Sequence, residues 1–489
     1  MAIRDLLTGA GSSVGLALAV VCVAASLLGA PRAEAQVGGD LCLSVDVPAP
    51  SAAAQRLRFG IAPLPAGSAG ATQAQPKPES PAAAKAELVR LRPGRRQLVL
   101  YLNRMFWSDG EGGVRRYAGL VDDYARAGFD SELQVRYHPG PGQEGDMAAW
   151  AGYVKTAARI LGKRSAVKAL TITNEVNFPI SPNTSDGSYA GALQAIVTGV
   201  VAARRALDRI GRPDVELGFA FAWRWLPASD AEFWRQLGAL GTPRFRRALD
   251  YVGLHIYPGL VFPPLTPPAV AGGDTVEALT LMRNCYMPQA GLGRKVELWV
   301  TENGYATNLA RTEPDQDLAL RSTIDAVYRY SGTLGVTDYR WFNLRDNDSA
   351  GTDLFAAVGL LRDDYSEKPA FATYSSYIDQ IGTNRPKPGR CGSRIATVLG
   401  TAGHDVLRGG RGPDVIATGS GRDVVRGGRG VDRICSGAGR DLISGGPGRD
   451  SLVGGPGADR IRGGPGNDRC PAGSHDRIRS CVDKAVAKR

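Results

Sequence analysis

Residues 167–177 read VKALTITNEVN, a short β-rich apolar run that ends on polar residues. Similar runs recur along the chain, and amphipathic helical stretches lie between them. Eight runs are predicted to be strands: 57–63, 97–106, 131–137, 167–173, 215–222, 251–257, 296–301 and 337–343. Eight strand–helix units between residues 57 and 382 average about 41 residues each, which predicts the α/β class and a (β/α)8 TIM barrel.

Helices are expected between these strands, at residues 114–127, 147–161, 189–210, 275–287 and 316–330. Residues 66–86 are rich in Ala, Pro, Gly, Ser and Gln and are interpreted as a loop within the first unit. An open doubly wound sheet is the competing fold, but no Gly-rich phosphate turn follows the first strand. The strand count therefore favours the barrel.

The composition excludes several classes of protein. With 489 residues, 43% hydrophobic and 22% charged, the chain is too long for one ordinary domain and too apolar for disorder. Only residues 14–30 are apolar enough to suggest a membrane, so a multi-span membrane protein is excluded. The expected organisation is a signal peptide (1–35), a barrel (36–385), a linker (386–398), repeats (399–470) and a basic C-terminal tail (471–489).

The N-terminus has the pattern of a secretory signal. Arg4 precedes the apolar run, and Ala33-Glu34-Ala35 forms a small-x-small cleavage site, so the mature chain is expected to begin at Gln36. Because Asp5 offsets Arg4, an uncleaved N-terminal anchor is the alternative. Loss of Cys22 leaves six cysteines, an even number that suits disulfides in a secreted or extracellular protein, which could also associate with the cell surface. Cys470 and Cys481 are the expected close pair, and none of the six has zinc-ligand spacing.

In a barrel of this kind the chemistry belongs at the C-terminal ends of the strands. Asn174 and Glu175 follow the fourth strand, and Glu302 follows the seventh in LWVTENG, residues 298–304. The two glutamates are 127 positions apart, about three units, as the fourth and seventh strands require. Other polar or aromatic residues at strand ends are His138, His255, Tyr257 and Trp341.

This conjunction resembles the large clan of retaining (β/α)8 glycoside hydrolases that includes cellulases, mannanases and β-xylosidases. The resemblance implies that Glu175 is the acid/base and Glu302 the nucleophile, set roughly 5 to 5.5 Å apart. It further implies that Asn174 holds the sugar 2-hydroxyl, Tyr257 donates to Glu302, and His255 lines the sugar subsite.

Further substrate-binding roles are expected around the carboxylate pair. Trp341 would offer a flat face to the sugar, and His138 ends the third strand beside the cleft. Either Arg104 or Arg136 could lower the pKa of the nucleophile. Three further tryptophans could extend the cleft into additional subsites: Trp107, Trp223 and Trp225.

The C-terminal region contains a strict nonapeptide repeat. An aspartate recurs every nine residues, with glycine two positions before it: Asp405, Asp414, Asp423, Asp432, Asp441, Asp450, Asp459 and Asp468. Two positions after each aspartate comes an apolar residue, or Cys470 in the last copy. The eight copies resemble the hemolysin-type (RTX-like) calcium-binding repeat of parallel β-rolls, which implies aspartates 18 apart on each of two edges and structural calcium between coils.

This tail departs from the usual acidic pattern. Residues 390–489 hold 18 Lys or Arg against 10 Asp, most of the chain's net charge of +11. Arg422 and Arg440 could pair with carboxylates in place of calcium. The basic surface could instead bind an anionic cell-wall polymer or acidic polysaccharide, and nucleic acid is disfavoured because the repeats lack aromatic residues.

Two functions of different classes follow. The first is a secreted retaining glycosidase that needs no cofactor for catalysis, with a β-roll for export, stability or attachment. The second is a non-catalytic, calcium-dependent carbohydrate-binding or cell-surface protein. Retention of both Glu175 and Glu302 favours the enzyme, because a binder has no need of two facing carboxylates. A transglycosylase with the same site is not separated from a hydrolase by sequence.

Overall fold

The computed structural model describes residues 42, 46–50, 54–64, 77–179, 184–223, 226–260, 266–308, 310–383, 390–392, 394–396, 398–400, 404–410, 412–471, 473 and 475–482. The predicted signal peptide, most of the predicted loop at 66–86, Trp225 and Arg411 lie outside these residues. Within the described ranges, no helix is both long and apolar enough to cross a membrane.

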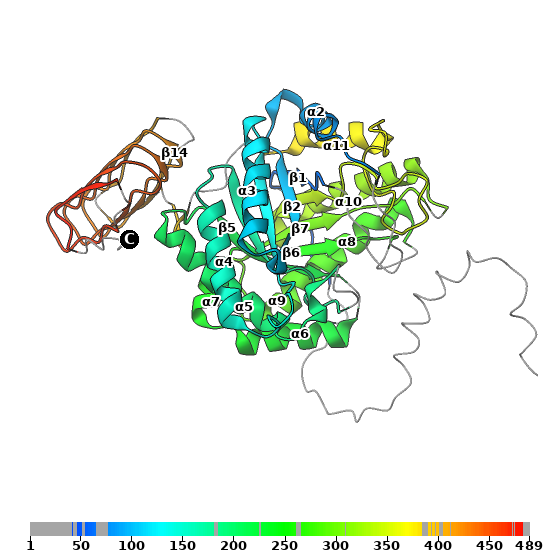
Figure 1. Ribbon diagram of the computed structural model, residues 1–489, viewed down its shortest axis with the longest axis horizontal. Coiled ribbons are helices and arrows are strands. Elements are labelled where there is room, and N and C mark those ends of the chain that lie inside the picture. Colours follow the sequence, from blue (N-terminus) through cyan, green and yellow to red (C-terminus); the bar gives the residue numbers. More distant parts are fainter. Residues whose placement is uncertain are drawn as a thin grey trace, which may run out of the picture. The chain divides into compact units, whose positions relative to one another are not determined.

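Eight parallel strands close into a barrel in sequence order (Figure 1). They are β1 (Arg58–Ile61), β2 (Val99–Phe106), β3 (Asp130–Arg136), β4 (Val167–Ile172), β5 (Glu216–Ala222), β6 (Tyr251–Ile256), β7 (Glu297–Asn303) and β8 (Val336–Trp341). β8 pairs with β1 and completes the ring. The TIM-barrel prediction is confirmed, and the predicted strands lie within two residues of the observed ones.

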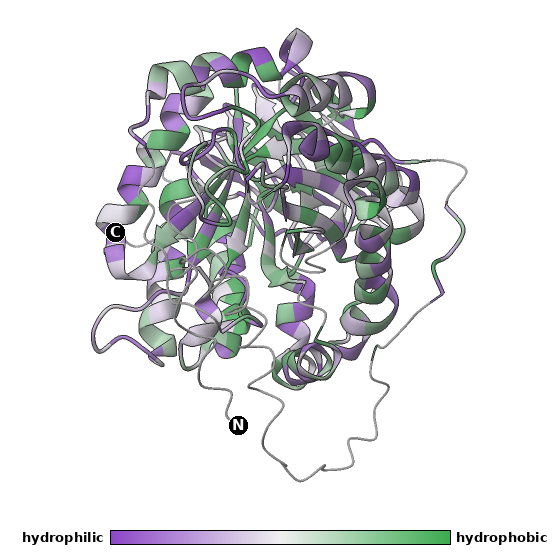
Figure 2. Ribbon diagram, turned by 90° about the vertical axis from the view of Figure 1, so that its right-hand side faces the viewer, coloured by the Kyte–Doolittle hydropathy of each residue, from purple (hydrophilic) through white to green (hydrophobic). Residues whose placement is uncertain are grey.

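Helices surround the barrel and connect successive strands. They are α2 (Pro81–Leu91), α3 (Gly110–Arg126), α4 (Met147–Leu161), α5 (Ala192–Arg209), α6 (Pro227–Leu240), α7 (Pro243–Ala248), α8 (Ala271–Leu281), α9 (Met287–Gln289), α10 (Glu313–Leu334) and α11 (Pro369–Ile381). The longest, α10, begins at a capping box of Thr312 and Asp315 and ends at Gly335, whose φ is 66°. Figure 2 shows polar and apolar residues alternating along these helices, as amphipathic helices require.

One helix lies where a loop was predicted. α2 occupies residues 81–91, so the loop prediction is wrong for residues 81–86. The Ser80 hydroxyl accepts the Ala83 N–H at 3.3 Å, and Pro81 fits the first helical turn, where a backbone donor is not needed. The sequence therefore contained a helix start within its Ala- and Pro-rich stretch.

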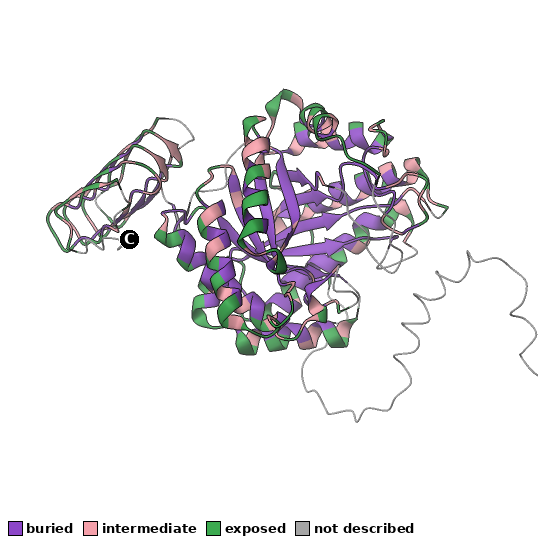
Figure 3. Ribbon diagram, viewed as in Figure 1, coloured by how far each residue is buried: buried purple, intermediate pink, exposed green. Residues whose placement is uncertain are grey.

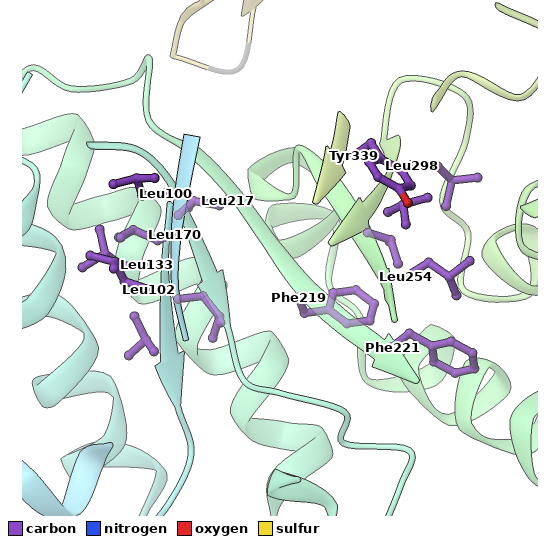
Figure 4. Packing of buried hydrophobic residues seen from close by; sticks show 14 of the residues in the cluster. Leu100, Leu102, Leu133, Leu170, Leu217, Phe219, Phe221, Leu254, Leu298 and Tyr339 are labelled. Carbon is purple, nitrogen blue, oxygen red and sulfur yellow. The ribbon is translucent and has the colours of Figure 1, made fainter. Parts of the chain in front are cut away.

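The outward residues of the strands form the main core with the helices. Leucine and aromatic side chains fill this layer, among them Leu100, Leu133, Leu217 and Phe219 (Figure 4). The strands are accordingly buried throughout, whereas the helices expose their outer faces (Figure 3). Burial on both faces explains why the strands are apolar runs rather than alternating ones.

The barrel interior holds a network of buried charges. The Arg58 guanidinium donates to Asp338 at 2.6 Å and to Glu216 at 2.7 Å, and the Arg340 guanidinium donates to Asp338 at 2.7 Å and to Glu132 at 3.1 Å. Arg340 crosses the seam opposite Gly60, where an added Cβ would lie 2.3 Å from the Arg340 Cδ. Closure of the ring therefore requires a residue without a side chain at position 60.

The C-terminal strands form a parallel roll. One sheet contains β11 (Val398–Leu399), β13 (Val415–Ala417), β16 (Arg433–Cys435) and β19 (Ser451–Val453). The other contains β12 (Val406–Arg408), β15 (Val424–Arg426), β18 (Leu442–Ser444), β20 (Arg460–Arg462) and β21 (Arg477–Arg479). β14 (Ser420–Gly421) pairs with β17 (Ala438–Gly439). Between the sheets lies a column of apolar residues spaced nine apart: Ile416, Val425, Ile434, Ile443, Leu452 and Ile461.

The roll extends beyond the predicted repeats at both ends. The predicted linker at 386–398 contains a hairpin of β9 (Arg390–Cys391) and β10 (Arg394–Ile395), and β21 lies in the predicted basic tail. Disulfides join Cys391 to Cys435 and Cys470 to Cys481, the latter as predicted. In the barrel, Cys42 is joined to Cys285. Each end of the roll is thus covalently fixed.

Gly60→Ala is expected to lower the free energy of unfolding by about 1–3 kcal/mol, because the new Cβ would meet the Arg340 side chain and the Val99 carbonyl oxygen. The matched control is Gly152→Ala on the exposed side of α4, where no atom lies within 4 Å. This control should stabilise the protein by about 0.5–1 kcal/mol. Urea unfolding followed by tryptophan fluorescence measures both, and a neutral Gly60→Ala would contradict the close-packed seam.

Candidate functional site

The two predicted catalytic glutamates meet at the C-terminal end of the barrel. One carboxylate oxygen each of Glu175 and Glu302 and the Nδ1 of His255 lie within 4.8 Å of one another. Glu175 Oε1 is 2.9 Å from His255 Nδ1, and Glu302 Oε2 is 3.4 Å from the same nitrogen. The side chains of Glu302 and His255 are buried, and that of Glu175 is 14% exposed. A carboxyl pair with one member open to solvent is thereby assembled from β4 and β7.

An unusual backbone turn places Glu175. Thr173 and Glu175 both have positive φ, 70° and 47°, immediately after β4. Buried Asp186 holds this turn, since its Oδ2 accepts the N–H groups of Asn174 and Tyr137, each at 2.8 Å. Left-handed conformations of residues other than glycine are costly and persist where the surroundings enforce them. Asp186 supplies that enforcement at the end of β4.

A change of register places Glu302. Along β7 the pairing with β8 shifts between Val300 and Asn303, and the pairing with β6 shifts between Leu254 and His255. With strict alternation Glu302 would share the outward face of Val300. Irregularities of this kind re-aim side chains next to active sites. Here they set His255 beside Glu302 at the mouth of the barrel.

His255 lies between the two carboxylates, and its expected contact with the sugar stays a prediction. Burial by itself lowers the pKa of His255, but attraction by Glu302 and the hydrogen bond to Glu175 outweigh it, so the pKa is raised. A Glu-His-Glu group of this size could also hold a divalent cation. Because both Glu302 and Glu175 raise the pKa of His255, the imidazole couples the two carboxylates electrostatically.

Tyr257 contacts Glu302 as predicted. Its hydroxyl donates to Glu302 Oε2 at 2.7 Å. Burial raises the pKa of Glu302, while His255 and the hydrogen bond from Tyr257 act in the opposite direction and Glu175 adds to the increase. Burial, followed by the charge of Glu302, also raises the pKa of Tyr257, which keeps the phenol a donor. The net result is a carboxyl whose pKa lies above the ordinary value.

The two arginines expected to lower the pKa of the nucleophile, Arg104 and Arg136, lie in different surroundings. Arg136 is buried, and its Nε donates to Asp186 at 2.8 Å, so it belongs to the group that fixes the Glu175 turn. Arg104 instead lines a depression beside α3 with Tyr117 and Leu120. Its expected role near the nucleophile is therefore contradicted, because its side chain is directed to the helix layer.

Asn174 is held by the protein itself. Its Oδ1 accepts from Gln134 Nε2 at 2.8 Å, and its Nδ2 donates to the Thr184 carbonyl at 2.7 Å. An amide NH2 carries two hydrogens, and the second has no acceptor among the described residues. His138 lies half-buried against Phe106 and Tyr189, with ring centroids at 4.8 and 5.2 Å. Burial, then the charge of Arg136, lowers the pKa of His138.

The expected sugar platform at Trp341 is contradicted. Trp341 is 1% exposed, and its indole donates to the Val358 carbonyl at 3.2 Å. The next residue, Phe342, precedes a cis peptide bond and meets Tyr257 edge-on at 6.3 Å. Trp107 and Trp223 are likewise buried in aromatic clusters. An apolar strand end does not by itself indicate which aromatic residue faces the cleft.

Three residues of the site were missed by the sequence analysis. Tyr101 is buried beside Glu302. Phe355, half-buried in the loop after β8, meets the Tyr257 ring edge-on at 5.4 Å. Asp186 lies 11 positions after Glu175, in a loop without any motif. Only the inward position of Tyr101 within an apolar strand could have indicated its role.

The aspartates of the roll form two ladders. From Asp423 to Asp468, the Oδ1 of each repeat aspartate accepts the N–H of the aspartate 18 positions earlier, at 2.9 Å in all six pairs. The repeat aspartates therefore lie on two edges with an 18-residue spacing, as predicted. Arg422 and Arg440 form no ion pair with a described carboxylate, so the proposed salt-bridge ladder is not found in this part of the chain.

The second carboxylate oxygens are suited to a cation. The buried Oδ2 atoms of five aspartates have no hydrogen-bond partner among the described residues: Asp432, Asp441, Asp450, Asp459 and Asp468. At Gly445 an added Cβ would lie 2.5 Å from Asp450 Oδ2 and 2.6 Å from the Gly463 carbonyl oxygen. Carboxylate and carbonyl oxygens are the ligands that calcium prefers. The donor set of the turns thus fits calcium.

Without a cation these carboxylates are poorly stabilised. Burial raises the pKa of Asp441 and of Asp450 to about 6, and that of Asp459 to about 7. Asp423 differs, because the Thr418 hydroxyl donates to its Oδ2. The turn at Asp423 is therefore partly satisfied by the protein, whereas those at Asp450 and Asp459 are not.

Comparison with known proteins matches the tail to a family. Residues 399–434 and 436–470 match the RTX calcium-binding nonapeptide repeat (4 copies). A search of curated proteins found no match.

Solved structures similar to the chain include two barrel proteins. GH5_18 from Streptomyces cattleya in complex with GlcNAc is 18% identical, with a TM-score of 0.46, over 73% of this chain and 86% of that one. The family 1 β-glucosidase from Thermotoga maritima in complex with isofagomine lactam is 15% identical, with a TM-score of 0.43, over 61% and 85%.

Asp450→Asn is expected to weaken calcium binding, because it removes charge from an oxygen that no protein group satisfies. Asp423→Asn is the matched control and should change binding less, since Thr418 already serves its Oδ2. Calorimetric titration of the oxidised full chain measures both variants.

Calcium affinity of the wild type should fall as the pH drops from about 7 to 5, because protons compete for Asp441, Asp450 and Asp459. In the absence of calcium, the stability of the roll should change with pH in the opposite direction to the calcium affinity. The folded roll binds more protons than the unfolded chain in this window, so its stability should rise as the pH falls. For the two variants above, equal calcium affinities of Asp450→Asn and Asp423→Asn would contradict the assignment of the Asp450 turn.

Proposed function

We propose that the protein is a retaining glycoside hydrolase that cleaves a β-linked glycoside by double displacement. The observation that carries the proposal is the meeting of Glu175 and Glu302 at the barrel mouth, with oxygens of both within 4.8 Å. This spacing is compatible with the roughly 5 to 5.5 Å between carboxyl groups of retaining enzymes and too short for the water that inverting enzymes admit.

In the first step the Glu302 carboxylate attacks the anomeric carbon while protonated Glu175 donates its proton to the leaving oxygen. The glycosidic C–O bond breaks, and an ester forms between the sugar and Glu302. Glu175 suits the acid role because it is the more exposed of the two and can reach the leaving group. Tyr257 holds the attacking carboxylate through its 2.7 Å hydrogen bond.

In the second step Glu175, now ionised, takes a proton from water, and the water oxygen attacks the same carbon. The ester bond to Glu302 breaks, and the sugar leaves with its configuration retained. If a sugar hydroxyl replaces water, the same step forms a new glycoside, so a transglycosylase remains within the proposal. The remaining hydrogen of Asn174 Nδ2 would contact the sugar 2-hydroxyl.

His255 acts as a positioning residue in this scheme. When it is protonated, its cation between the carboxylates opposes the rise in the pKa of Glu302 that burial causes. The same cation favours the ionised form of the nucleophile before attack. His255 thus adjusts the charge of the pair without touching the substrate.

A metal-dependent hydrolase is the second candidate, favoured by the Glu-His-Glu grouping. Such a site would use a transition metal, since imidazole together with carboxylate suits zinc and similar ions better than calcium. The two candidates differ in their response to metal removal.

The roll is proposed to bind calcium and to serve export, stability or attachment. Its match to the RTX repeat and the unpartnered aspartate oxygens support calcium. The three disulfides support folding in an oxidising compartment outside the cytoplasm. A secreted enzyme acting on external polysaccharide is consistent with both features.

Glu302→Gln is expected to abolish turnover of every substrate, because the amide cannot form the glycosyl ester. Glu175→Ala should lower kcat about 10²–10⁴-fold on substrates with poor leaving groups and spare aryl glycosides that need no proton. The assay uses the oxidised full chain with calcium on a panel of aryl glycosides and polysaccharides, followed by NMR for anomeric configuration.

The matched control is Glu297→Gln at the opposite end of β7, which should retain activity. Each protein is also stripped with a chelator and returned to calcium alone. Activity restored by calcium favours the carboxyl pair, whereas a need for zinc favours the metal site. Wild-type and variant proteins that bind a glycan but are equally inert across the panel would overturn the enzyme in favour of the binder.

His255→Asn is expected to move the acidic limb of kcat/KM to higher pH. Asparagine keeps a hydrogen-bonding group near Glu175 but removes the cation that lowers the pKa of Glu302. Because Glu302 must be ionised to attack, activity should be lost at a higher pH than in the wild type. A pH–rate profile measures this, and an unshifted limb with lower kcat would indicate a purely structural role.

A further inference from the structure

One face of the roll carries arginines in strict register. The outward residues of β12, β15, β18, β20 and β21 form two rows across the sheet, and together they are called the arginine face here. The first row is Val406, Val424, Leu442, Arg460 and Arg477, and the second is Arg408, Arg426, Ser444, Arg462 and Arg479. Residues between the rows point inward to the core.

The arginine face is strongly basic and exposed. All six of its arginines are exposed, and none of its ten positions is acidic. Among the described residues none of the six forms an ion pair. Six of the eight repeat aspartates are buried in the turns, and none of the eight occupies a position of this face. Like charges directly opposite one another on a sheet are unfavourable, so the rows leave a repulsion that an external anion can relieve.

The spacing of the rows indicates the form of the anion. Neighbouring strands lie about 4.8 Å apart, so the second row spans about 19 Å over its four intervals. Guanidinium groups bind carboxylates and sulfates through two parallel hydrogen bonds. A chain with a charge on successive units matches a row of such groups better than an isolated ion does.

The residues next to the arginines indicate which class of anionic ligand fits the arginine face. Val406 is 62% exposed and Leu442 is 49% exposed, so apolar surface lies next to the cations. Sugar rings present apolar C–H faces together with charged substituents, whereas single-stranded nucleic acid requires aromatic side chains for stacking, and the face has none. The combination favours an acidic polysaccharide.

The opposite sheet offers no comparable surface among the described residues. Val415, Ala417 and Cys435 on its outer side are buried in a cluster with Cys391 of the β9–β10 hairpin. The Cys391–Cys435 disulfide fixes that hairpin to β16. The hairpin therefore covers one end of this sheet, whereas the arginine face is exposed along its whole length.

We propose that the arginine face binds a linear acidic polysaccharide bearing carboxylate or sulfate groups on successive sugars. This binding is independent of the proposed catalytic pair and would attach the protein to an anionic matrix. The tail thereby performs a recognition function in addition to holding calcium.

The test compares two variants of the oxidised full chain in calcium. In the first, Arg408, Arg426, Arg462 and Arg479 are replaced by serine, the residue already present in the same row at position 444. In the second, the exposed turn residues Arg422, Arg429, Arg440 and Arg449 are replaced by serine, an identical change of charge away from the rows. The probes are soluble oligogalacturonate for carboxylate, heparin oligosaccharide for sulfate, a neutral cello-oligosaccharide, and phosphatidylglycerol vesicles.

The wild type should bind one or both acidic oligosaccharides and not the neutral one, with affinity falling as salt rises. The first variant should bind at least about tenfold more weakly, and the second should change less than about twofold. Both should retain activity on a neutral aryl glycoside, which separates this test from that of the catalytic proposal.

Equal losses in the two variants would overturn the ordered face in favour of overall charge, and binding to vesicles alone would assign the face to lipid. If the fourfold variant fails to fold by circular dichroism, Arg426→Ser and Arg462→Ser are tested singly. Unchanged affinity in both single variants would then overturn the proposal.

Discussion

The architecture depends on the closure of the barrel between β1 and β8. Gly60 lies opposite Arg340 at this seam, and the arginine passes across it to reach Asp338 and Glu132 inside the barrel. Buried charges are tolerable only when each is paired, and removing one partner leaves an uncompensated ion. Closure thus fixes the register of eight strands, and that register brings the ends of β4 and β7 to the same mouth.

The site depends on departures from regular strand geometry. Left-handed residues after β4 turn Glu175 towards the mouth, and register shifts along β6 and β7 bring His255 and Glu302 together. Asp186 enforces the first departure through two backbone N–H groups and Arg136. The hydrogen bonds from His255 to Glu175 and from Tyr257 to Glu302 then hold the two carboxylates and the imidazole in contact.

Sequence patterns predicted the elements well and the orientation of side chains less well. Apolar runs located all eight strands, but strict alternation would have directed Glu302 outward. Trp341 and Arg104 were assigned to the cleft from their positions at strand ends, yet one is packed in the core and the other faces α3. Strand position gives the level of a residue in the barrel, whereas bulges and helix packing decide its direction.

The sequence by itself determined the barrel and the nonapeptide roll, because periodicity is a local property of the chain, and the resemblance at the ends of the fourth and seventh strands pointed to the carboxylate pair. The tertiary structure decided that His255 lies between the carboxylates, that Asp186 holds the turn, and that six arginines share one face. Those relations join residues from separate strands and loops, and they follow from closure and register rather than from any local pattern.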